Sequence, residues 1–284
     1  MFVIFNIRRI SAIFLSICVL MTAGGVFYVR SRAEDGVQLP ILMYHSVLKD
    51  TSRTGKYIIT PDRIESDLQY LAERGYKSVS ASDVIAYATN DGKLPEKPYL
   101  ITFDDGCYNN LTYVLPLLEK YDAYAVISVV GSYCEEFSEN GEANAAYSYL
   151  RWEDITELNN TGRIEFGNHS YDMHSITSAR IGSKIARGED KWTYIDKFSR
   201  DCGKTQQLLA DNCGITPVVY AYPFGAYCEE SHNVLDEKGF VMTLTCTEGI
   251  NELKRSADCL YLMKRFNRPG TLMTETFFEK CGIK

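Results

Sequence analysis

Short apolar runs alternate along this chain with longer segments whose apolar residues recur at helical spacing. The runs are typical of buried strands, and the longer segments are typical of helices. Because alternating strands and helices form a parallel sheet with the helices packed outside it, the pattern predicts a parallel α/β barrel. The predicted strands are residues 39–45, 76–80, 97–103, 123–130, 163–167, 217–221, 240–244 and 260–266. The predicted helices are residues 61–74, 82–88, 109–121, 152–160, 191–211 and 229–238, with a short helix from Thr274.

Polar side chains with metal-binding chemistry follow two of these strands. Asp104 and Asp105 end the third predicted strand, and His169 and His174 follow the fifth. The carboxyl ends of parallel strands meet at one edge, where the active sites of barrels lie. Two imidazoles, one carboxylate ligand and a second carboxylate as base are what a hydrolytic metal site needs. Taken separately, Asp-Asp-Gly is also favourable turn chemistry, and the histidines can be an ordinary surface pair.

The N-terminus contains a stretch long enough to cross a membrane. Residues 10–29 carry no charge, and arginines flank them on both sides. A helix of this length spans a hydrocarbon core of about 30 Å. We therefore expect a cytoplasmic N-terminus at 1–9, a transmembrane signal anchor at 10–29, a linker at 30–38 and one large domain at 39–284. A cleaved signal peptide, with a weak cleavage site at 22–24, and a buried core helix are the alternatives.

The composition restricts the function further. The formal net charge is −7 and no basic stripe follows the N-terminus, which argues against a nucleic-acid-binding protein. The 20 tyrosines are compatible with stacking on sugar rings, although tyrosine is also common in cores and strands. Of the 9 cysteines, all but Cys18 follow the apolar stretch, so disulfides and free buried thiols both stay open.

A third segment completes a pattern with the first two. The three segments, in chain order, are Thr-Phe-Asp-Asp-Gly at 102–106, His-Ser-x-x-x-His at 169–174 and aromatic-Pro-aromatic-Gly at 222–225. The order resembles that of the polysaccharide deacetylases, the NodB-like carbohydrate esterases. The resemblance covers roughly residues 39–270 and includes the opening segment 42–47. It implies a distorted parallel (β/α) barrel of about seven strands, here preceded by one N-terminal transmembrane helix.

The resemblance also implies roles for individual residues. Asp105, His169 and His174 would hold a divalent metal ion, Zn²⁺ or another such as Co²⁺, and Asp104 would be the general base. The backbone N–H of Phe224 would help to hold the oxyanion. The segment that meets the substrate and the oxyanion would consist of Tyr222, Pro223, Phe224 and Gly225, although Pro223 and Gly225 also suit a plain turn.

Two departures from the family pattern leave roles to be filled. The arginine that precedes the proline of the third segment is absent, and Arg265 or Arg268 can take over its contact with the base. The late histidine that protonates the leaving amine is absent too, because no histidine follows His232. His45, at the end of the first predicted strand, is the candidate acid, and a strand-end hydrogen bond is its plainer role.

Together these observations predict a metal-dependent hydrolase that removes N-acetyl groups from N-acetylglucosamine-type polysaccharide, either peptidoglycan or a cell-surface glycan. The partners are then the polymer and, through the N-terminal helix, the cell membrane. The catalytic domain would lie outside the cytoplasm, and would be secreted if the N-terminal segment were cleaved. An O-acetyl esterase acting on acetylated xylan is the nearest alternative, because the same metal site serves esters. A catalytically weak wall-binding protein is the alternative from another class, favoured by the two departures.

Overall fold

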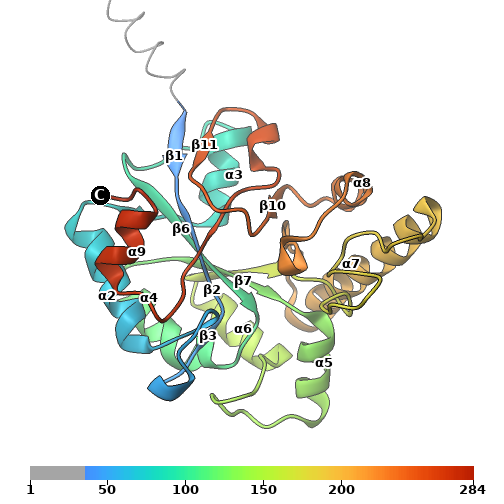
Figure 1. Ribbon diagram of the computed structural model, residues 1–284, viewed down its shortest axis with the longest axis horizontal. Coiled ribbons are helices and arrows are strands. Elements are labelled where there is room, and N and C mark those ends of the chain that lie inside the picture. The colour runs from blue at the N-terminus through green and yellow to red at the C-terminus, as the bar shows by residue number, and fades with distance from the viewer. Residues whose placement is uncertain (1–35) are drawn as a thin grey trace, which may run out of the picture. The chain divides into compact units, whose positions relative to one another are not determined.

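A parallel sheet forms the centre of the computed structural model, which describes residues 36–284; Gln38 to Lys284 form one compact unit. In spatial order the strands are β10 (Met242–Leu244), β9 (Val219–Ala221), β8 (Ile164–Asn168), β7 (Ala125–Val129), β6 (Pro98–Asp105), β2 (Ile41–Tyr44) and β12 (Phe266–Asn267), with β5 (Lys77–Ser78) beside β6 (Figure 1). A parallel bridge between Leu244 and Met263 links β10 to the segment that enters β12. A distorted parallel (β/α) barrel of about seven strands was predicted; the α/β class is confirmed, and the observed form is a curled parallel half-barrel with seven strands in its main path.

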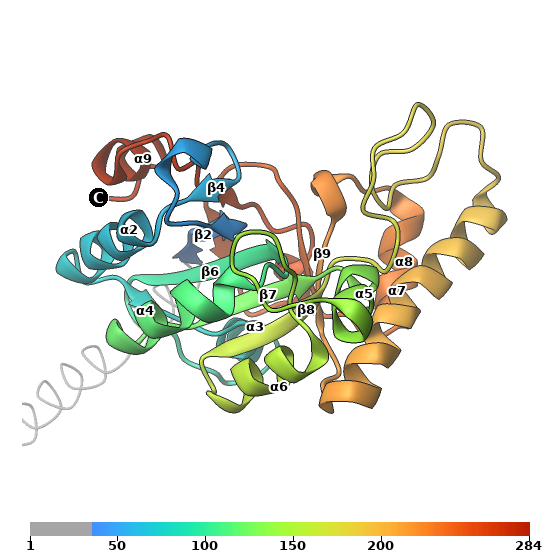
Figure 2. The same cartoon turned by 90° about the horizontal axis from the view of Figure 1, so that it is seen from below.

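Eight helices and two small strand pairs surround this sheet within the described residues. The pairs are β1 (Val37–Leu39) with β11 (Asn251–Leu253), and β3 (Ser46–Val47) with β4 (Ile58–Ile59). The helices are α2 (Pro61–Glu73), α3 (Ala81–Thr89), α4 (Leu115–Lys120), α5 (Gly131–Asn140), α6 (Trp152–Asn160), α7 (Lys191–Cys213), α8 (Glu229–Glu237) and α9 (Thr274–Lys280). Figure 2 shows α7 and α8 side by side near β9, and α2 and α9 side by side near β2.

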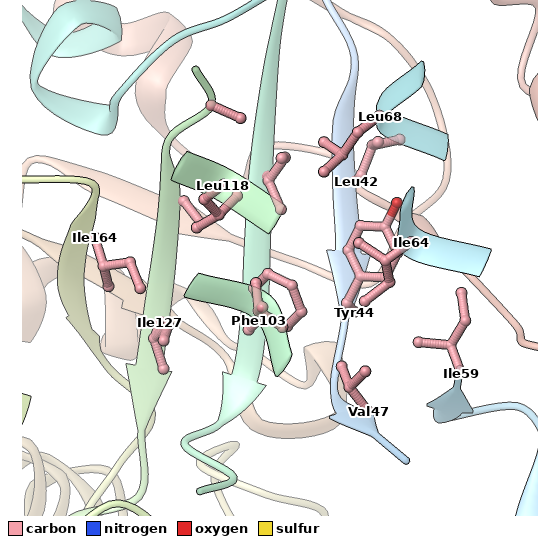
Figure 3. Packing of buried hydrophobic residues seen from close by; sticks show 14 of the residues in the cluster. Leu42, Tyr44, Val47, Ile59, Ile64, Leu68, Phe103, Leu118, Ile127 and Ile164 are labelled. Atoms are coloured by element: carbon pink, nitrogen blue, oxygen red, sulfur yellow. The ribbon is translucent and has the colours of Figure 1, made fainter. Parts of the chain in front are cut away.

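The main core lies between the sheet and the helices that cover it. Every residue of β2 and β7 is buried, as expected for parallel strands that are covered on both faces. Figure 3 shows Leu42, Phe103 and Ile127 from three neighbouring strands packed toward Leu68 of α2 and Leu118 of α4. This packing explains why the strands appear in the sequence as continuous apolar runs instead of alternating ones. It also leaves the strand ends to carry the polar side chains.

A buried ion pair ties the C-terminal segment to α2. Arg268 donates from Nε and Nη2 to the two carboxylate oxygens of Asp67, at 2.8 and 3.0 Å. Both side chains are fully buried, and hydroxyl groups of Tyr44 and Thr274 donate to the same carboxylate. Four donors around one carboxylate compensate for the cost of removing its charge from water. Arg268 is therefore a structural residue, located away from the candidate site.

Some element boundaries differ from the prediction for local reasons. Ser80 caps α3 through a capping box with Asp83, so this helix begins at Ala81, before the start predicted at Ser82. The single helix predicted at 109–121 is a π-turn at Asn110–Val114 followed by α4. Pro116 has no N–H, so the helical hydrogen-bond ladder cannot run uninterrupted through this stretch. Helix α5 was not predicted, because its sequence lacks a clear apolar period.

Two further predictions concern the N-terminus and the cysteines. The transmembrane segment predicted at 10–29 lies outside the described residues. A search of residues 36–284 found no helix with the length and apolar character of a membrane span. Disulfides and free thiols were both left open by the sequence. All the cysteines among residues 36–284 are free thiols.

Candidate active site

The end of β6 places two adjacent carboxylates in different surroundings. Asp104 is buried with 2% of its surface exposed, whereas Asp105 is partly exposed and has a φ of 74°. This left-handed backbone costs about 1–3 kcal/mol in a non-glycine residue and is found mainly at functional sites. Gly106 continues the turn with a φ of 73°, and a Cβ there would lie 2.9 Å from Cγ1 of Val129. The glycine is therefore required both for its conformation and for the space it leaves.

One carboxylate oxygen and two imidazole nitrogens come together beside β6 and β8. They belong to Asp105, His169 and His174. Oδ1 of Asp105 lies 3.2 Å from Nε2 of His174 and 3.6 Å from Nε2 of His169. One candidate ligand atom from each residue lies within 4.8 Å of the other two. The structure therefore unites the three residues that the sequence analysis proposed as metal ligands.

The protonation and pairing of these groups fit a divalent metal ion. Oδ1 of Asp105 is buried and has no hydrogen-bond partner among residues 36–284, as expected of an atom that has another ligand to bind. Nδ1 of His169 lies 2.7 Å from the carbonyl oxygen of Ala221 and must donate to it. The lone pair of this imidazole is therefore on Nε2, which faces Asp105. Burial lowers the pKa of His169 to about 4, so the ring is neutral, the form that binds metals.

Asp104 is held by a buried arginine. Nη1 and Nη2 of Arg265 donate to the two carboxylate oxygens of Asp104 at 2.7 and 2.8 Å. Arg265 is itself fixed by a hydrogen bond from Nε to the carbonyl oxygen of Thr245, at 2.9 Å. Burial alone would raise the pKa of Asp104, but the Arg265 guanidinium and the neighbouring histidines hold that pKa well below its usual range. Asp104 is therefore an ionised, fixed carboxylate, and of the two arginines proposed for this contact it is Arg265 that makes it.

His45 faces the same space from the end of β2. Its Nδ1 is buried and finds no hydrogen-bond partner in the part of the chain that the structure describes. The ring lies against Tyr57, with 4.7 Å between the ring centroids. Burial lowers the pKa of His45, although the carboxylates of Asp104 and Asp105 act in the opposite direction. The plainer role of a strand-end hydrogen bond is not seen for this nitrogen, and His45 lines the same cavity as Asp104 and Asp105.

The third segment contributes its backbone and one ring. Phe224 has a φ of 58° and stacks on His174 with 4.7 Å between ring centroids, so its ring forms part of the wall. Gly225 approaches Cys246 so closely that a Cβ would lie 2.7 Å from the Cys246 backbone nitrogen. Tyr222 is fully buried in a second apolar cluster and does not line the cavity, so its side chain is not available for the predicted substrate contact. Pro223 is likewise buried, in its case within the turn.

Residues 91–243, more than half of the chain, match the family model described as polysaccharide deacetylase. The chain belongs to the polysaccharide deacetylase family. It is therefore a hydrolase of carbohydrate metabolism, as the three sequence motifs indicated. His45 and Arg265 lie outside the matched range, so their association with the site depends on the structure.

Relatives of this deacetylase chain support the same assignment. YxkH of Bacillus subtilis is 26% identical over 222 residues, which are 77% of this chain and 68% of the relative. The poly-β-1,6-N-acetyl-D-glucosamine N-deacetylase of Escherichia coli is 23% identical over 74% of this chain, a match that spans only 34% of that longer protein. The solved structure of a de-N-acetylase from Aggregatibacter actinomycetemcomitans superposes with a TM-score of 0.73 at 21% identity. It covers 84% of this chain and 99% of that one, and it shows that the fold is shared.

The candidate catalytic and metal-binding residues of this family member line one cavity of about 640 Å³. The sequence analysis missed several residues of its wall, because no motif contains them. Lys56 and Tyr57 come from the loop before β4, and Cys246 and Glu248 follow β10. Asn267 was closest to being found, since it lies between the two arginines that the sequence analysis did single out. These residues are brought in by tertiary folding alone.

Two smaller cavities continue from the central one. The first has about 310 Å³, shares His45, Tyr57 and Asp105 with it, and reaches Tyr147 and Tyr149. The second has about 210 Å³ and reaches Phe266 and Leu272.

The residues common to the central and second cavities are Lys56, Glu248 and Asn267. Oδ1 of Asn267 is buried without a hydrogen-bond partner among the described residues, which makes it a free acceptor at this junction. The cavity that holds the candidate metal ligands is therefore continuous with two recesses, which extends it beyond the space around Asp105, His169 and His174.

Proposed function

We propose that this protein is a metal-dependent N-deacetylase of N-acetylglucosamine-containing polysaccharide. The observation that carries the proposal is the Asp104–Arg265 pair beside Asp105, His169 and His174 in one cavity. An ionised carboxylate next to an open two-nitrogen, one-oxygen site is the arrangement used for amide hydrolysis by activated water. The family assignment agrees with this chemistry.

The first half of the reaction is assigned to Asp104. A bound Zn²⁺, or another divalent ion, would polarise the acetamide carbonyl and make water a stronger nucleophile near neutral pH. Asp104 takes the proton of the water that attacks the carbonyl carbon, and Arg265 holds both carboxylate oxygens in place for that step. The backbone N–H of Phe224 is assigned to the oxyanion, because Phe224 lines the cavity beside His174.

The second half of the reaction needs a proton for the departing amine. When the C–N bond breaks, the sugar nitrogen must be protonated, and His45 is the imidazole in the cavity that is left over from the ligand set. A lowered pKa makes its protonated form a stronger acid toward the amine, although fewer molecules carry that proton at neutral pH. The absence of the motif arginine and of the late histidine had favoured a wall-binding protein. In this proposal Arg265 replaces that arginine and His45 replaces that histidine.

The substrate is proposed to be a polymer instead of a single sugar. The two recesses that continue from the central cavity offer room for sugars next to the one being deacetylated. Aromatic rings such as Tyr57, Tyr147 and Phe224 can stack on the apolar faces of sugars. The name of the E. coli relative indicates a poly-N-acetylglucosamine substrate for that protein, and we extend this substrate class to the present chain.

Acetate release from defined substrates tests the proposed function. The full chain is loaded with Zn²⁺ and supplied with N-acetylglucosamine oligomers of two to six units, or with acetylated xylan. We expect acetate from the N-acetylglucosamine oligomers, with kcat/KM rising until the oligomer fills both recesses. Acetate from xylan alone would favour an O-acetyl esterase. Acetate from neither substrate, despite bound metal, would leave the wall-binding alternative.

Replacement of His45 by alanine tests the proton-return step. We expect kcat to fall by about 10²- to 10³-fold, because general acid catalysis contributes on this order. Zinc affinity should stay close to that of the wild type, since Nδ1 of His45 is not part of the ligand set. Rates are measured on an N-acetylglucosamine oligomer and zinc binding by competition with a chelating dye. A wild-type rate for His45→Ala would remove His45 as the acid.

We also propose that the protein is held at the cell membrane by residues 10–29, with its catalytic domain outside the cytoplasm. The support is the uncharged run of that segment and the extracytoplasmic location of the polymers proposed as substrate. Fractionation of cells that express the full chain or a chain lacking residues 1–35 tests this point. Equal recovery of both forms in the soluble fraction would contradict it.

A further inference from the structure

The two histidines of the candidate metal site are fixed to different degrees. His169 is held by its side chain, through the 2.7 Å hydrogen bond to the carbonyl of Ala221. Nδ1 of His174 has the hydroxyl of Tyr133 at 3.5 Å, the outer limit of a hydrogen bond. The ring of His174 also stacks on Phe224 and its Nε2 faces Asp105, but neither contact fixes Nδ1, so the placement of the ring also depends on the backbone of the loop that carries it. That loop consists of residues 170–173.

The first part of this loop is anchored to α5. Gly131 and Ser132, the first residues of α5, donate their N–H groups to the carbonyl oxygens of Ser170 and Tyr171 at 3.0 and 3.1 Å. Ser170 has a φ of 72°, a conformation that must be held by its surroundings. Its N–H donates to Oδ1 of Asn168 at 2.9 Å. Two backbone carbonyl groups of the loop thus accept hydrogen bonds from N–H groups at the N-terminus of α5, which have no partner within the helix.

Two backbone N–H groups of the loop donate hydrogen bonds to one carboxylate. Oδ1 of Asp201 accepts from the backbone N–H of Tyr171 at 2.9 Å, and Oδ2 accepts from that of Asp172 at 2.8 Å. Asp201 is half-buried and lies on α7, a long helix far away in the sequence. The adjacent carbonyl of Cys202 accepts from Nδ2 of Asn168 at 2.8 Å, so α7 holds both the middle of the loop and the strand end that precedes it. Charge-assisted bonds of this kind are stronger than neutral ones.

We propose that Asp201 is a positioning residue that sets the place of His174 and thereby the affinity of the site for its metal ion. The inference rests on the proposed function only in requiring that the site binds a divalent ion. Supporting groups around metal ligands typically change metal affinity by about 10- to 100-fold when they are removed. The substitution Asp201→Asn keeps one acceptor oxygen but turns an amide N–H₂ toward a backbone N–H. The loop then loses one hydrogen bond and gains a repulsive contact.

The test compares two Asp→Asn substitutions on the same helix in the full chain. Asp211 is an exposed residue of α7 whose carboxylate accepts from the Gln207 side chain, so Asp211→Asn is the matched control. Zinc dissociation constants are measured by competition with a chelating dye, together with the thermal unfolding midpoints of the metal-free proteins. We expect a dissociation constant about 10-fold or more above wild type for Asp201→Asn, and within about 2-fold of wild type for Asp211→Asn. At saturating zinc, kcat of Asp201→Asn should return to near the wild-type value.

Several outcomes would overturn the inference. The inference fails if Asp201→Asn binds zinc as tightly as Asp211→Asn. It also fails if the zinc dissociation constant of Asp201→Asn equals that of the wild type while its kcat stays low at saturating zinc. If Asp201→Asn does not fold, Asp201→Glu is compared with Asp211→Glu, because the longer side chain keeps both acceptors but displaces the loop. Equal dissociation constants for that pair would also overturn it. A wild-type protein that binds no zinc would overturn both this inference and the proposed function, whereas tight binding by every variant would overturn the inference alone.

Discussion

The substitution Asp104→Asn is expected to abolish turnover while zinc binding survives, whereas Asp105→Asn is expected to lose both. Asparagine cannot accept the proton of the attacking water, and loss of a general base costs about 10²- to 10⁴-fold in rate. Asp104 takes no part in the ligand set, so the metal should still bind. Asp105 supplies the oxygen of that set, and an amide oxygen without charge binds a divalent ion less well.

Two measurements on each variant separate the roles of these adjacent carboxylates. Acetate release gives the rate, and competition with a chelating dye gives the zinc dissociation constant. The residual rate of Asp104→Asn should stay low even at saturating zinc, because its defect is in proton transfer. If both variants lost zinc, or if both kept it with equal loss of rate, the assignment of one base and one ligand would be wrong.

The second large effect is expected at Arg265. The change Arg265→Met removes the partner of a buried carboxylate, and breaking a buried ion pair in this way costs about 3–5 kcal/mol of unfolding free energy. Arg268→Met is the matched control, because Arg268 and Asp67 form a second fully buried pair of the same kind. Denaturant unfolding should show a similar loss of stability for both variants. The kcat, measured on the folded proteins, should fall strongly for Arg265→Met and stay near wild type for Arg268→Met.

The pH dependence distinguishes the catalytic effect of Arg265 from its effect on stability. In the wild type, Arg265 overcomes the effect of burial and holds the pKa of Asp104 below its usual range. A carboxyl whose pKa is lower in the folded protein than in the unfolded chain stabilises the folded state. This stabilisation is fully present above the pKa of the unfolded chain, about 3.9, and is lost as the pH falls toward the pKa of the folded protein. Without Arg265, burial acts unopposed by that cation and raises the pKa of Asp104. The acid limb of the rate profile should then move to higher pH in Arg265→Met and stay unmoved in Arg268→Met.

The parts of this structure that follow from local sequence were predictable. Helix α2 begins at Pro61 after Thr60 and stops before Gly75, whose φ is 77°, because proline and glycine act through their own backbone chemistry. The run at 97–103 was recognisable as a strand because parallel strands are buried on both faces. The clustering of the three candidate metal ligands was predictable, since motifs at the carboxyl ends of parallel strands meet at one edge.

The parts that depend on distant contacts were not predictable. Arg265 and Arg268 are separated by two residues, and only the folded chain shows that one reaches Asp104 and the other Asp67. The carboxylate of Asp201 accepts from main-chain N–H groups of a loop about thirty residues before it, and those N–H groups leave no mark on the sequence of the loop. Tyr222 belonged to a recognisable motif, yet its side chain packs into the core. A motif identifies which residues occur together, and packing decides which of them face the cavity.

The most direct test of a metal-dependent N-deacetylase is the acetate released from a poly-N-acetylglucosamine oligomer by one preparation of the full chain in three states. The states are zinc-loaded, stripped with a chelator, and reloaded with one equivalent of Zn²⁺. We predict acetate release in the first state, loss of it in the second and recovery in the third, with Asp104→Asn inactive in all three. Acetate release that is equal before and after removal of the metal would contradict the account.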